Sequence, residues 1–206
     1  MTRDAERLER SKDPVLVGGL PDAPGILTAL NLTPGLGVHL RGLADQLLVE
    51  DFPGTTLHRY EREMLATATS AGNDCFYCMD SHGAFATALL ERDGRQDLLP
   101  VIDVIKDGGS EGLSPKMQAL LHISRTVRRQ PLDLTADDVA AAHSAGATDA
   151  DVQLAVLIAG AFSMYNRYVD GFRAMTPPVA EVYRERAGQI AEHGYSAPQV
   201  AAVPGR

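Results

Sequence analysis

The stretch NDCFYCMDSH, residues 73–82, holds the two cysteines of the chain, Cys75 and Cys78, with His82 four residues beyond the second. On an α-helix each residue turns by about 100°, so these three side chains fall within an arc of about 60° and can meet. Two thiols and an imidazole that meet can perform redox chemistry at sulfur, with the imidazole accepting the proton of a reacting cysteine. The same residues can instead bind a metal or lie inert in the core.

Two opposing effects act on these thiols if residues 73–74 cap the helix, as asparagine and aspartate often do. Cys75 then lies in the first turn, where unpaired amides and the helix dipole favour a thiolate. The apolar stripe below the motif faces the core, and burial raises the pKa of a thiol because it opposes the charged form. His82 lies one turn below Cys78 and can accept its proton. The pattern therefore predicts a reactive thiolate.

A metal site and an inert pair remain alternatives at this point. A structural zinc site takes four protein ligands, and a catalytic one takes three. The chain has no second cysteine pair, and its other histidines come singly: His39, His58, His122, His143 and His193. We therefore expect no metal. Because cysteine is among the most often buried residue types, a non-enzymatic helical interaction protein with an inert pair would carry the same motif.

The elements that position the motif are predicted to be helices. Nearly all patterned segments recur with a helical period, and no alternating runs are joined by a hairpin signal, which predicts an all-α fold of about eight helices in a single domain. Residues 1–24 are predicted to form an N-terminal arm and residues 25–175 the helical domain. Residues 176–206 are predicted to form a C-terminal helix, with the last dozen residues as a tail.

Several helices carry individual signals. Ser114, Thr135 and Thr148 stand where an N-cap is expected, and Pro115 follows the first of them. Residues 154–162 are apolar around the whole circumference of a helix, which predicts a central, buried helix.

Other side chains near the motif have simpler expected roles. Asp80 points away from the cysteine arc and is expected to face solvent. Arg167 and Asp170 are three residues apart on a later helix, and we expect them to form a helical ion pair. Tyr77 is expected to line the mouth of the site.

Length and charge limit the classes of function. The 206 residues carry a formal net charge of −8 and no run of more than two basic residues, so we expect neither a nucleic acid nor an anionic membrane as partner. The charged start lacks the apolar centre of a signal peptide, and residues 154–162 are too short to cross a bilayer. We expect a cytoplasmic protein, in which such a cysteine pair is more often catalytic or metal-binding than structural.

The segment REMLATATSAGNDCFYCMDSHGAFA, residues 62–86, resembles the alkylhydroperoxidase D-like group of the carboxymuconolactone decarboxylase superfamily, whose pattern places a glutamate twelve residues before C-x-x-C-x-x-x-H. A weaker likeness begins at LTADDVAAAHSAGA and continues to residue 172. With the segment PGILTALNLTPGLG and the residues after it, the likeness covers most of residues 24–173. The resemblance implies the helical fold of that group and assembly into homo-oligomers.

The resemblance also implies a role for each matching residue. Cys78 matches the peroxidatic cysteine, Cys75 its resolving partner, His82 the base on the same helix, and Glu63 the carboxylate on the preceding helix that completes a proton relay. The residue before the second cysteine departs from the well-known pattern, which has a histidine where this chain has Tyr77. The helical period alone would leave Glu63 as a solvated residue at the shoulder of an apolar face, so the resemblance is what selects it.

The function implied by the resemblance is that of a peroxidase. The thiolate of Cys78 reduces a hydroperoxide and becomes a sulfenic acid, Cys75 resolves it as a disulfide, and an external dithiol or protein reductant restores the pair. The alternative is a dithiol–disulfide oxidoreductase that carries electrons between partners with little peroxidase activity. A lactone decarboxylase, as the family implies, does not use the cysteine pair. No dinucleotide or flavin fingerprint occurs, so we expect no bound organic cofactor.

Overall fold

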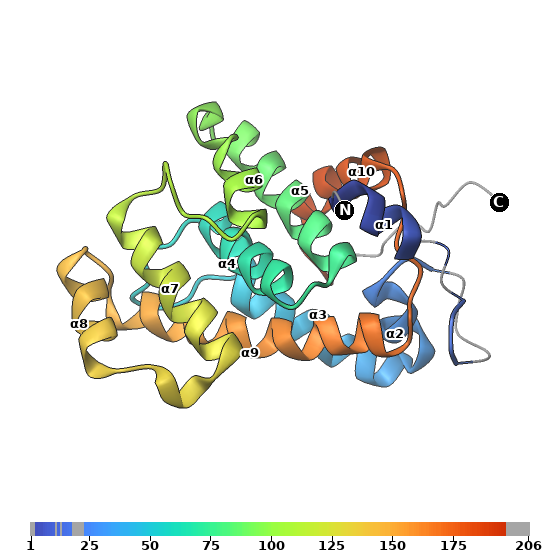
Figure 1. The fold of residues 1–206 in the computed structure, drawn as a ribbon, viewed down its shortest axis with the longest axis horizontal. Coiled ribbons are helices and arrows are strands. Elements are labelled where there is room, and N and C mark those ends of the chain that lie inside the picture. Colours follow the sequence, from blue (N-terminus) through green and yellow to red (C-terminus); the bar gives the residue numbers. More distant parts are fainter. Residues whose placement is uncertain (1–2, 11, 13, 18–22, 197–206) are drawn as a thin grey trace.

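The computed structural model describes residues 3–10, 12, 14–17 and 23–196 of the chain (Figure 1). The α-helices are α1 (Arg3–Arg10), α2 (Ile26–Leu32), α3 (Pro34–Leu48), α4 (Arg59–Gly72), α5 (Phe76–Arg92), α6 (Val101–Lys106), α7 (Pro115–Arg129), α8 (Ala136–Ser144), α9 (Asp149–Gly171) and α10 (Ala180–His193). These ranges contain no β-strand, so the all-α prediction is confirmed. The sequence predicted about eight helices. The two it did not predict are α1 and α2.

Helix starts follow the capping signals in the sequence. The hydroxyl of Ser114 accepts a hydrogen bond from the backbone N–H of Met117 at 3.3 Å at the start of α7. Thr135 and Thr148 form capping boxes with aspartates three positions further on, at the starts of α8 and α9. Each cap satisfies a backbone N–H group that the first turn leaves without a partner, so these three predicted boundaries are confirmed.

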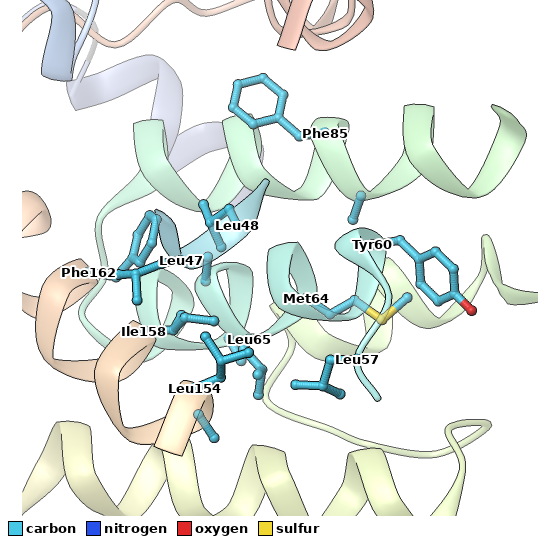
Figure 2. Close-up of a cluster of buried hydrophobic side chains, with 14 of the residues drawn as sticks. Leu47, Leu48, Leu57, Tyr60, Met64, Leu65, Phe85, Leu154, Ile158 and Phe162 are labelled. Carbon is cyan, nitrogen blue, oxygen red and sulfur yellow. The ribbon is translucent and has the colours of Figure 1, made fainter. Parts of the chain in front are cut away.

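The central helix of the fold is α4. All its residues from Tyr60 to Ser70 are buried, because α5, α7 and α9 all pack against it. Figure 2 shows Leu65 of α4 close to Leu154 and Ile158 of α9, with Met64 of α4 near Leu57. Since α4 is covered on all sides, even a polar residue at the shoulder of its apolar face is buried.

The long helix α9 is amphipathic rather than buried all round. Leu154 and Ile158 are fully buried in the core that α9 shares with α4. Leu157 on its other face is 47% exposed, which corrects the prediction of a helix buried around its whole circumference. Within the described part of the chain no helix, α9 included, is long and apolar enough to span a membrane.

Helix α10 brings the C-terminal segment against the helix that carries the cysteines. It packs along α5 (Figure 1). The guanidinium groups of Arg59 on α4 and Arg92 on α5 donate to the carbonyl of Ala191 at 2.9 and 3.0 Å. Cationic donors at this end meet carbonyls that the last turn of a helix leaves unpaired. The end of α10 is therefore fixed to the two helices that carry the motif.

Candidate active site

The two cysteines lie where the chain turns from α4 into α5. The backbone of Asp74 is left-handed, with φ of 55°, and the N–H of Cys75 donates to the carbonyl of Ser70 at 3.0 Å. A left-handed residue cannot continue a right-handed helix. For this reason α5 begins only after Cys75, which is its N-cap residue, and not at residues 73–74 as predicted. It is Cys78 that lies in the first turn.

Both cysteines are free thiols with buried side chains. Cys75 has no exposed surface and Cys78 is 2% exposed. A hydrogen bond to Cys78, together with burial, raises the pKa of Cys75 well above its usual value. A protonated Cys75 beside Cys78 can donate its hydrogen to the neighbouring sulfur.

A carboxyl group of α9 also contacts Cys75. Burial raises the pKa of Asp170, and its hydrogen bond with the Cys75 thiol acts in the opposite direction. The charge of Asp170 in turn adds to the rise in the pKa of Cys75. The predicted ion pair between Arg167 and Asp170 is wrong, because Arg167 donates to the carbonyl of Ser163 at 2.6 Å. Asp170 is part of the surroundings of the cysteines.

A buried carboxylate and an imidazole form the second part of the site. Glu63 of α4 is fully buried, and its Oε2 lies 2.7 Å from Nδ1 of His82 on α5. Its Oε1 accepts a hydrogen bond from the hydroxyl of Tyr195 at 2.7 Å. Because a carboxylate can only accept hydrogen bonds, Nδ1 of His82 carries a proton and Nε2 is left as the basic nitrogen.

Tyr195 is a site residue that the sequence did not predict. Its ring lies 6.1 Å from that of His82, centroid to centroid. Burial and the neighbouring charge of Glu63 raise the pKa of Tyr195 well above its usual value, so the hydroxyl remains a donor to the carboxylate. Glu63 is thus held by one donor on each oxygen.

The backbone around Tyr195 is fixed to α3. The carboxylate of Asp45 accepts from the N–H of Tyr195 at 2.6 Å and from the N–H of Ser196 at 2.9 Å. The preceding Gly194 has φ of 75°, a conformation that glycine adopts without strain. The predicted tail is therefore wrong for these first two residues, and its remaining residues lie outside those described. The one sequence signal at this point is the glycine before an aromatic residue.

A pocket brings Cys78 and His82 to a common space of about 540 Å³, including the part that is open to solvent. Its lining comes from α2, α3, α5, α9 and α10, together with Tyr195 beyond the end of α10. The lining residues are Ile26, Leu30, Leu40, Arg41, Ala44, Tyr77, Cys78, Ser81, His82, Phe85, Phe162, Tyr165, Arg186 and Tyr195. Cys75 does not line it. A small molecule in this pocket would meet one of the two thiols.

Tyr77, which the sequence predicted at the mouth of the site, is one of the residues that line this pocket. Its ring lies so close to Gly25 that a Cβ on that glycine would come within 2.1 Å of it, and Gly25 itself is left-handed with φ of 52°. The Tyr77 hydroxyl accepts from Nη1 of Arg186 at 3.3 Å. Tyr77 therefore packs between the residue before α2 and helix α10, in one buried cluster with both cysteines.

Asp80 is buried, which corrects the prediction that it faces solvent. Its side chain forms an ion pair of 2.9 Å with Lys106 of α6 and is 8% exposed. Helix α6 packs on that face of α5, and a Cβ on Gly83 would come within 2.6 Å of the same lysine. This pair fixes α6 on the side of α5 away from the pocket.

The structure brings the four predicted site residues together as two pairs. Cys75 is hydrogen-bonded to Cys78, and Glu63 is hydrogen-bonded to His82. No hydrogen bond between Cys78 and His82 occurs in the described structure, although both line the pocket. No group of three or more histidine, cysteine, aspartate or glutamate residues that could hold a metal ion occurs in the part of the chain that is described.

Two solved structures resemble this chain over most of its length. The structure of an alkylhydroperoxidase AhpD core, an uncharacterized peroxidase-related protein from Ralstonia eutropha JMP134, is 25% identical; the match covers 80% of this chain and 81% of that one, with a TM-score of 0.65. An uncharacterized peroxidase-related protein from Silicibacter sp. TM1040 is 21% identical over 84% of this chain and 95% of that one, with a TM-score of 0.68. No family model and no curated protein matches the sequence.

Proposed function

The chain has the alkylhydroperoxidase D-like fold, and from this premise we propose that it is a thiol-dependent peroxidase. The observation that supports the proposal most is the pocket, where Cys78 and His82 meet while Cys75 lies behind it. The names of both similar structures, peroxidase-related proteins, agree with this activity. A carboxylate–imidazole pair beside a thiol that lines a pocket suits an activated nucleophile.

The first step reduces the hydroperoxide to an alcohol. The thiolate of Cys78 attacks the terminal oxygen, the O–O bond breaks, and Cys78 becomes a sulfenic acid while an alkoxide leaves. His82 accepts the thiol proton at Nε2 and returns it to the alkoxide, while Glu63 holds the ring through Nδ1–H. Because Cys78 and His82 are not hydrogen-bonded at rest, a water molecule or the substrate carries that proton between them.

The second step closes a disulfide. The sulfur of Cys75 attacks the sulfenic sulfur of Cys78, and the hydroxyl group leaves as water. The proton that Cys75 loses in this attack joins the leaving hydroxyl group to form that water. An external dithiol or protein reductant then supplies two electrons by thiol–disulfide exchange and restores both thiols.

A thiol titration tests the proposal. One equivalent of hydroperoxide should remove two titratable thiols from the reduced protein, and dithiothreitol should restore them. With excess dithiothreitol the protein should consume hydroperoxide catalytically, while the Cys78→Ser variant should not. Survival of both thiols in the wild type, with rapid exchange against a disulfide reagent, would favour an electron carrier. Failure of both reactions would mean an inert pair.

A further inference from the structure

Two arginines line the otherwise largely apolar pocket. Arg41 comes from α3 and Arg186 from α10, and the pocket wall between them includes Leu30, Leu40 and Phe162. Charged side chains seldom face an apolar cavity without a partner, because the loss of hydration is costly. A buried guanidinium group is normally paired with a carboxylate.

The hydrogen-bond partners of both guanidinium groups are neutral. Nη2 of Arg41 donates to the amide oxygen of Asn31 at 2.9 Å, and Nη1 of Arg186 donates to the hydroxyl of Tyr77 at 3.3 Å. Nε of Arg186 is buried without a hydrogen-bond partner. In the described residues neither arginine forms an ion pair with a carboxylate. Among the described residues, these donors therefore face the pocket without a carboxylate partner.

The two positive charges also lie near each other. Burial lowers the pKa of Arg41, and the charge of Arg186 lowers it further. Like charges that converge on one cavity repel each other. An anion between them would remove that repulsion and accept hydrogen bonds from both planar groups.

We infer that the pocket binds an anionic substrate, a hydroperoxide that carries a carboxylate, with the carboxylate at Arg41 and Arg186 and the peroxide at Cys78. The carbon chain between the two groups would lie against Leu30 and Leu40. Arg186 donates to Tyr77, the residue next to Cys78, so the spacer is on the order of one tyrosine side chain in length. The peroxide half of this inference rests on the proposed function, and the carboxylate half does not.

The kinetic test compares a medium-chain hydroperoxy fatty acid with its methyl ester. We expect the wild type to prefer the acid by about 10- to 100-fold in kcat/KM, since a charge-assisted pair is lost in the ester. Arg186→Gln and Arg41→Gln should each reduce this ratio of acid to ester by about tenfold, and Arg186→Lys should retain part of it. Thermal unfolding of each variant checks that the fold is intact.

Arg184 provides the matched control. It lies on the same helix as Arg186, but its side chain is 71% exposed and pairs with Glu181 at the surface. Arg184→Gln should leave the preference for the acid unchanged. An equal fall of the ratio in this control would show a general effect of protein charge and overturn the inference.

A binding measurement separates the two proposals. Octanoate, which has no peroxide, should bind to the Cys78→Ser protein in calorimetry, and Arg186→Gln should weaken that binding by about tenfold. If octanoate binds in this way but no hydroperoxide is reduced, the anion site stands and the proposed function fails. If hydroperoxides are reduced with equal kcat/KM for acid and ester, and octanoate does not bind, the anion site fails and the peroxidase remains.

Discussion

The two sulfur atoms of this site lie one helical turn apart in different surroundings. On the pocket side, Cys78 shares a cavity with His82, whose ring is held by Glu63. On the side of α9, Cys75 does not line the pocket and is hydrogen-bonded to Asp170. The pKa of Cys75 is raised. The spacing of the C-x-x-C motif does not distinguish the two cysteines. Their unequal surroundings come from the helices that pack around them.

Serine substitutions should separate the two sides most strongly. Cys78→Ser removes the one thiol that lines the pocket, and we expect hydroperoxide consumption with dithiothreitol to fall by at least about 10³-fold. Cys75→Ser should react once with hydroperoxide at close to the wild-type rate and then stop. Stopped-flow measurement of a single turnover distinguishes these results. Equal loss of the first reaction in both variants would contradict the assignment.

Glu63→Gln should have the next largest effect. The amide can no longer accept with a full negative charge from Nδ1–H of His82, so we expect the rate of Cys78 oxidation to fall by about 10²- to 10³-fold. Glu61→Gln is the matched control. Glu61 is also a buried glutamate of α4, but it accepts from the N–H of His58 at 2.9 Å as a helix cap, which glutamine can also do. A similar loss in both variants would indicate damage to α4.

Tyr195→Phe, which also acts on the pocket side through Glu63, should have a smaller effect on the rate of Cys78 oxidation. It removes one hydrogen bond to Glu63, and we expect the oxidation rate of Cys78 to fall by about 3- to 10-fold. Tyr60→Phe is a suitable control because Tyr60 is also buried and accepts a single hydrogen bond from Arg95, away from the pocket. An unchanged rate in Tyr195→Phe, with intact folding, would remove Tyr195 from the relay.

Asp170→Asn changes the surroundings of Cys75 on the side of α9 and should have the smallest effect of the four. The charge of Asp170 helps to raise the pKa of Cys75, so its removal should lower that pKa. More Cys75 thiolate is then present at a given pH, and the pH profile for disulfide formation should move to lower pH, with a rate about threefold higher at neutral pH. The decay of the sulfenic acid, followed against pH, measures this step. A slower decay at all pH values would mean that proton acceptance by Asp170 outweighs its charge.

The part of the site carried by consecutive helices could be predicted from the sequence. Cys75, Cys78 and His82 lie on or next to one helix, and helical spacing fixes their separation. Glu63 required the family pattern, because a helical period cannot show that α4 is covered on every side. The caps of α7, α8 and α9 were also predictable, since each is a local interaction between neighbouring residues.

The remaining site residues depend on contacts between distant segments. Tyr195 meets Glu63 across 132 positions in the sequence, and the pattern of its segment resembles that of a tail. Asp80 and Asp170 were assigned wrongly for a related reason. A helical period shows which residues share a face but not which neighbouring helix covers that face, and Lys106 covers the face of Asp80.

The central claim is that Cys78 alone meets the peroxide. The most direct measurement treats the Cys75→Ser and Cys78→Ser proteins with one equivalent of hydroperoxide, traps sulfenic acids with dimedone, and locates the adduct by peptide mass spectrometry. We predict an adduct on Cys78 in the first protein and none on Cys75 in the second. An adduct of similar yield on Cys75 would contradict the account, because the pocket would then not distinguish the two thiols.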